Sequence, residues 1–264
     1  MVEARLAGAS KGLSLGTTLA LAPIPGAGNL RGKGVLTLSG RNYSTAVVAR
    51  YAINPYLTVL ITADGNATFT DESADAQDDS TGTDVTLSSL PTSPTGYIYL
   101  GTAVPVRGYQ ADVDSANSTA SAMTGDYWNG SAWAAASITD GTTSGGASFA
   151  VDGNITFTVP SAWAQDSLVK ILGLTGRGPR GGTNAVLYEP LFWLRLSNSG
   201  AMDSSTTLNS LLPLNRSTVY AEIAASLPEQ IVIHGGRRGV GCIEALTDAG
   251  TANLLLSVAG EFAA

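Results

Sequence analysis

Apolar and polar residues alternate in several short stretches of the chain, a pattern that predicts β-strands. In residues 155–159, apolar side chains alternate with threonines, as expected for a strand with one buried face. Dipeptides such as Asp140-Gly141 and Asp152-Gly153 separate these stretches, and we expect them to turn through positive φ. Amphipathic-helix spacing is lacking, apart from a single turn at residues 161–166. We therefore predict an all-β fold, a β-sandwich or a jelly roll.

The N-terminal segment is predicted to be an extended arm over residues 1–30. Residues 12–30 carry no charge and hold several glycines and prolines, and they stop short of a membrane span. A signal peptide is the alternative, but Glu3 lies where such a peptide carries positive charge. We expect the arm to lie along a neighbouring subunit or along its own domain.

The remaining strands are predicted to form two β domains. We expect both ends of the chain to build a composite β domain, residues 31–95 plus 217–264, around a β-sandwich module at 96–200, with 201–216 as a linker. The predicted strands are residues 33–43, 45–51, 57–62, 97–100, 104–113, 126–134, 155–159, 191–197, 218–223, 230–233 and 253–258.

Composition narrows the function classes. Charged residues make up 13% of the chain, about half of the usual share, while 44% apolar residues suffice for a packed core. A net charge of −7 argues against a nucleic-acid surface. One cysteine, Cys242, excludes an internal disulfide or a thiolate zinc cluster, and one histidine, His234, leaves little for general-base chemistry. We expect a structural or binding protein that is not an enzyme, with no cofactor, metal or membrane partner.

Acidic residues gather in residues 64–84, which hold seven of the 21 Asp and Glu residues. The candidates for a calcium site are Asp71, Asp75, Asp78 and Asp79, but their spacing is not that of a calcium loop and no bidentate glutamate follows in register. We interpret the segment as a solvated acidic loop. A weak cation site or a contact between subunits stays open.

A basic glycine-rich loop is predicted at residues 176–181. The sequence GRGPRG matches the dinucleotide-binding pattern, but that pattern requires a helix directly after it. We expect no helix in residues 183–188, which Glu189-Pro190 and a strand follow. Arg177 and Arg180 are bidentate donors in a chain with few positive charges, and we expect them to hold an acidic loop of a neighbouring subunit.

A tryptophan pair lies on the predicted hairpin at residues 126–133. Asn129-Gly130 favours a two-residue type I′ turn, which makes Trp128 and Trp133 diagonal neighbours on one face. Two interpretations stay open: the indoles are core anchors of a sandwich, or they form an aromatic platform for sugar rings.

The segments YWNGSAW (127–133), DGT (140–142), ITFTVPSAW (155–163) and LFWLRLS (191–197) resemble a β-sandwich module of tailed-bacteriophage virion proteins. The resemblance covers residues 97–199, implies a structural module, and carries no catalytic residues across. Residues 173–189 depart from the compact form of that module, and we expect them to contact another subunit.

The resemblance implies a protein of the virion. We expect a capsid decoration (cement) protein, a homo-oligomer that binds the major capsid protein and bridges capsid subunits. The alternative is a tail, baseplate or fibre component, or a surface module, that binds host glycan through Trp128 or Trp133.

Overall fold

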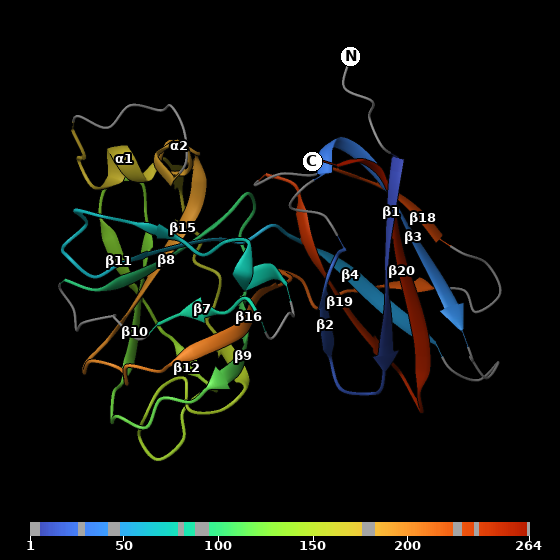
Figure 1. Ribbon diagram of the computed structural model, residues 1–264, viewed down its shortest axis with the longest axis horizontal. Coiled ribbons are helices and arrows are strands. Elements are labelled where there is room, and N and C mark those ends of the chain that lie inside the picture. Colours follow the sequence, from blue (N-terminus) through green and yellow to red (C-terminus); the bar gives the residue numbers. More distant parts are fainter. Residues whose placement is uncertain are drawn as a thin grey trace. The chain divides into compact units, whose positions relative to one another are not determined.

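The computed structural model describes residues 6–25, 30–41, 48–78, 82–87, 95–175, 183–223, 229–234 and 238–262 (Figure 1). The chain divides into two compact units. Unit 1 comprises Met1–Tyr56 and Leu212–Ala264, and unit 2 comprises Leu57–Leu211. Both units consist of antiparallel sheets in a β-sandwich-like arrangement, which confirms the all-β prediction.

Unit 1 is a sandwich of two four-stranded sheets, A and B. Leucines of sheet A, such as Leu36 and Leu256, are buried against Ile243 and Ala245 of sheet B. Sheet A contains, in order, β1 (Leu6–Leu15), β20 (Ala252–Phe262), β3 (Leu30–Arg41) and β18 (Glu229–His234). Sheet B contains β17 (Ala221–Ile223), β4 (Ala49–Pro55), β19 (Val240–Thr247) and β2 (Ala20–Pro23).

Unit 2 contains a seven-stranded sheet C and a five-stranded sheet D. Sheet C contains β11 (Trp133–Ala136), β10 (Met123–Trp128), β15 (Leu191–Asn198), β8 (Tyr97–Thr102), β5 (Thr58–Thr62) and β6 (Thr70–Asp71), and β14 (Gln165–Asp166) pairs with β15. Sheet D contains β12 (Thr139–Asp140), β13 (Gly153–Thr156), β9 (Gly108–Ser115), β16 (Thr207–Leu214) and β7 (Val85–Thr86). The short helices are α1 (Leu168–Ile171), α2 (Thr183–Leu187) and the 3-10 helix η2 (Asp75–Gln77).

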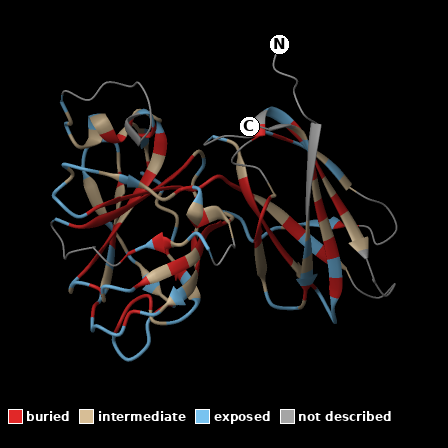
Figure 2. Cartoon of the chain, in the orientation of Figure 1, coloured by how far each residue is buried: buried red, intermediate tan, exposed pale blue. Residues whose placement is uncertain are grey.

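Both faces of sheet C are covered by apolar side chains. On β8, Ile98 and Leu100 pack into the core between sheets C and D. The alternate residues Tyr97 and Tyr99 lie in a second cluster on the outer face, together with residues of α1 and α2. Figure 2 shows this double burial as nearly continuous red along β8, whereas the loops of unit 2 are largely exposed. A strand that is buried on both faces typically has a continuous run of apolar residues in its sequence.

The predicted arm follows one of its two alternatives, and the predicted linker needs correction. Residues 6–15 lie along their own domain, where β1 pairs with β20 over ten residues, from Leu6↔Glu261 to Leu15↔Ala252. Leu13 and Leu15 pack into the core of unit 1, so this segment buries apolar surface within its own domain. Residues 201–216 are not a linker, since they contain the whole of β16.

The two ends of the chain do fold together in unit 1, but the boundaries differ from the predicted ones. Residues 57–95 belong to unit 2, because β5 pairs with β8 in register Leu60↔Tyr99. Glycines 141 and 153 also differ from expectation: neither has a positive φ, and Gly141 N–H instead donates to the carbonyl of Asn154.

Candidate functional site

Three of the four segments that carry the phage resemblance converge in unit 2. The Trp163 indole N–H donates to the carbonyl of Trp193 at 3.0 Å, and Ala164 N–H donates to the carbonyl of Trp128 at 2.9 Å. The Trp163 ring also makes edge contacts with Phe157 and Phe192. The loop after Phe157 thus joins the tryptophan hairpin to β15, and these segments form one packed framework.

The fourth segment, the DGT sequence, closes a loop of the same unit. The Asp140 carboxylate accepts hydrogen bonds from the Thr142 N–H at 2.9 Å and from the Thr142 and Thr143 hydroxyls. Burial raises the pKa of Asp140, but hydrogen bonds from Ser148 and both threonines outweigh it and leave the pKa below its usual range. The carboxylate is therefore an ionised structural cap.

The tryptophan hairpin differs in register from the predicted type I′ turn. Trp128 lies directly opposite Trp133, which leaves a four-residue loop, and the two indoles meet edge-on at 5.9 Å. The Asn129 side chain causes this, because its Oδ1 accepts from the Ser131 and Ala132 N–H groups at 3.0 and 2.9 Å. The side chain thereby replaces the turn that Asn-Gly favours.

Arg195 joins this hairpin to the outer face of sheet C. Its guanidinium carbon lies 4.6 Å from the ring centroids of both Tyr97 and Trp133, and its Nη2 lies 2.9 Å from Asp126 Oδ2. Cation–π contacts and the charged pair together hold the Arg195 side chain between two aromatic rings.

The packing bears on the two interpretations of the tryptophan pair. Trp128 is 8% exposed, and the half-buried Trp133 contacts Trp128, Tyr99 and Arg195. A sugar platform needs an open aromatic face, whereas these rings are occupied by protein neighbours. The geometry therefore favours the core-anchor interpretation.

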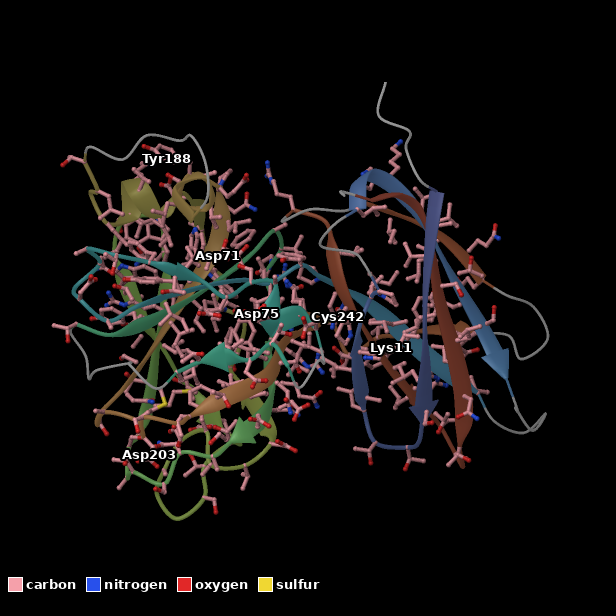
Figure 3. The ribbon with its side chains drawn as sticks, viewed as in Figure 1. Lys11, Asp71, Asp75, Tyr188, Asp203 and Cys242 are labelled. Atoms are coloured by element: carbon pink, nitrogen blue, oxygen red, sulfur yellow. The ribbon has the colours of Figure 1, made fainter. Side chains whose placement is uncertain are left out.

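The acidic segment is organised by local hydrogen bonds. Asp71 accepts from the Ser73 hydroxyl, and Asp78 accepts from the Thr83 hydroxyl at 3.0 Å. Asp71 and Asp75 are labelled in Figure 3, and Asp79 lies outside the described residues. Among the described residues, no group of three or more His, Cys, Asp or Glu side chains has the arrangement of a metal site.

Burial and, after it, neighbouring like charges raise pKa values in this segment. Burial, the neighbouring Asp75 carboxylate with which Glu72 shares a hydrogen bond, and the Asp71 charge raise the pKa of Glu72 from 4.5 to about 7. Burial and the charges of Asp114, Asp78 and Asp75 raise the pKa of Asp84. The acidic segment and Asp114 of β9 therefore form one region of mutually repelling carboxylates.

We expect Glu72 to make unit 2 less stable as the pH rises. Because the pKa of Glu72 is higher in the folded state than its ordinary value of 4.5, the unfolding free energy falls between pH 4.5 and about 7. Glu72→Gln removes this dependence. Urea unfolding at pH 5 and pH 8, followed by tryptophan fluorescence, measures it, and Glu189→Gln is the control. An equal pH dependence in both variants would contradict the assignment.

The remaining predicted residues do not form a site in the part of the chain that is described. Arg177 and Arg180 lie outside the described residues, so their predicted subunit contact stays a prediction. The expectation of no helix after this loop is wrong, because α2 covers Thr183–Leu187 and packs Val186 and Leu187 into the cluster on the outer face of sheet C. His234 is exposed at the end of β18. Cys242 is fully buried, and burial raises the pKa of its thiol, as expected for a packing residue.

A buried polar network in unit 1 was not predicted. Glu244 on β19 is 0% exposed, and it accepts hydrogen bonds from Asn54 Nδ2 at 3.1 Å, from Asn215 N–H at 2.8 Å and from the Tyr220 hydroxyl. Asn54 also donates to the carbonyl of Pro213 at 2.6 Å. The network attaches the segment after β16 to sheet B. The one signal in the sequence is a glutamate within an apolar run, GVGCIEAL.

Comparisons with protein-family models, curated proteins and solved structures find no match to this chain. No helix among the described residues has the length and apolar character needed to cross a membrane.

Proposed function

We propose that this chain is a non-enzymatic structural protein of a phage virion, a capsid decoration protein that binds the major capsid protein. The observation that carries the proposal is the packed framework of three segments with the phage resemblance, together with the fourth segment, which closes a loop of the same unit. Their indoles, carboxylates and backbone groups are used in internal contacts, such as Trp163 to Trp193 and Asp140 to Thr142. Side chains that make internal packing contacts indicate a rigid module and not a reaction centre.

The second unit extends this argument. A decoration protein must join a rigid body to several neighbours, and two separate sandwiches in one chain offer two binding bodies. The burial of Trp128 takes away the main support for a glycan-binding fibre, so decoration is the preferred role.

The copy number in purified particles tests the proposal. Quantitative mass spectrometry should give a ratio to the major capsid protein near one, or a simple fraction of it. A few copies per particle would place the chain at the tail or a single vertex and overturn the decoration role. Absence from the particle would overturn a virion role altogether.

A further inference from the structure

The two units carry opposite charge. Unit 1 holds nine Lys and Arg against six Asp and Glu, and unit 2 holds five against fifteen. Their formal charges are therefore +3 and −10, which add to the −7 of the whole chain. Such a division within one chain favours contact between unlike units of different copies.

Sheet A presents an open outer face in unit 1. Val35 and Val232 lie opposite each other on β3 and β18, and they are 37% and 64% exposed. Lys33 and His234 lie two residues further along these strands, opposite each other and on the same face, and both are exposed. Glu229 belongs to the inner side, where it accepts a hydrogen bond from the Tyr51 hydroxyl. Among the described side chains, this face has exposed apolar residues and a cation but no carboxylate.

Sheet D presents the opposite chemistry in unit 2. Its five strands contain no Lys or Arg. On β9, Tyr109 and Ala111 pack into the core, so the alternating Asp112 and Asp114 lie on the outer face. These carboxylates accept from the Asn209 amide and the Thr207 hydroxyl, which are neutral donors. Their charge is therefore available to a cationic partner.

We propose that the outer face of sheet A docks onto the outer face of sheet D in another copy of this chain. The contact is heterologous, because each copy offers one face of each kind, and it generates a ring or a row of copies. Lys33 lies against Asp112 and Asp114, and the exposed valines supply apolar area beside them. This contact rests on the proposed decoration function, in which it would join neighbouring decoration subunits.

Complementary variants of the full chain test the contact. The first carries Lys33→Glu and Val232→Glu, and the second carries Asp112→Lys and Asp114→Lys. We expect the unsubstituted chain to self-associate at low salt, and each variant to raise the dissociation constant by about tenfold or more. Mixing the two variants should restore association, because one pair of unsubstituted faces remains and the two substituted faces again carry opposite charges. Sedimentation velocity measures both results.

A matched control separates this contact from general charge effects. Arg216→Glu with Val219→Glu makes the same change in net charge on unit 1 at exposed positions outside sheet A, and Val219 is 82% exposed. We expect this control to associate like the unsubstituted chain. An equal loss in the control, a mixture that does not associate, or a monomeric unsubstituted chain at low salt would overturn the proposal.

Should the lysine variant fail to fold, judged by tryptophan fluorescence, Asp112→Asn with Asp114→Asn replaces it and should weaken association by less. The test uses the isolated chain and no capsid. If the chain does not self-associate, the expected copy number in particles is unaffected. If the copy number contradicts the decoration role, the contact between copies can still be correct.

Discussion

Trp128→Ala should destabilise unit 2 by about 3–5 kcal/mol, the usual cost of removing a buried tryptophan. Trp128 is 8% exposed, its indole meets that of Trp133 at 5.9 Å, and its carbonyl accepts from Ala164 N–H. Truncation leaves a cavity where the hairpin meets the loop at Ala164. All four tryptophans lie in unit 2, so the fluorescence of the other three follows urea unfolding of this unit alone.

Trp128→Phe is the matched control for this prediction. The Trp128 Nε1 group is buried and has no hydrogen-bond partner among the described residues, so phenylalanine loses volume but no hydrogen bond. We expect it to cost clearly less than alanine, below about 1.5 kcal/mol. If Trp128→Ala left stability unchanged and abolished binding to a glycan array, the core-anchor interpretation would be wrong and the glycan-binding alternative would return.

Alternation along the chain was sufficient to predict the fold class and many strands. Residues 57–62, 97–100, 191–197 and 253–258 are predicted strands that coincide with β5, β8, β15 and β20. Their apolar and β-branched residues favour strands through local sterics and burial, so the sequence signal is local. Pairing is not local, and this is why β1 was missed.

The β1 sequence LAGASKGLSL is rich in small residues and has weak strand propensity of its own. It becomes a strand because β20, far away in the sequence, offers a ten-residue edge. The boundary after Tyr56 likewise has no signal in the sequence. β4 and β5 are separated by two residues, yet they belong to different units. A linker can be recognised by its composition, but here the chain passes from unit 1 to unit 2 without a linker.

The candidate site was predicted in its residue types and not in its contacts. The tryptophan pair was found on one face, but the Asn129 side chain changed the hairpin register. Arg195 carried no sequence signal, because its partners Asp126, Tyr97 and Trp133 come from three other strands. Side-chain networks assembled from distant strands depend on the sheet order, which alternation does not determine.

Glu244→Ala is expected to destabilise unit 1 by about 3 kcal/mol or more. The substitution takes a buried acceptor from the Asn215 N–H and the Tyr220 hydroxyl, and it leaves a cavity beside Asn54. Glu244→Gln should cost about 1 kcal/mol, because its carbonyl oxygen can serve Asn54 and Asn215 while the Tyr220 hydroxyl turns to accept from the amide.

An exposed glutamate of the same sheet provides the comparison. Glu222 on β17 is 63% exposed and pairs with Arg50 at 3.3 Å, so Glu222→Ala should cost below about 1 kcal/mol. Unit 1 contains no tryptophan, and hydrogen–deuterium exchange of β4 and β19 peptides in urea therefore measures its stability. If Glu244→Ala were as stable as Glu222→Ala, the network would not hold the segment after β16 on sheet B. If the predicted order holds, a single buried carboxylate fixes the place where the chain re-enters unit 1.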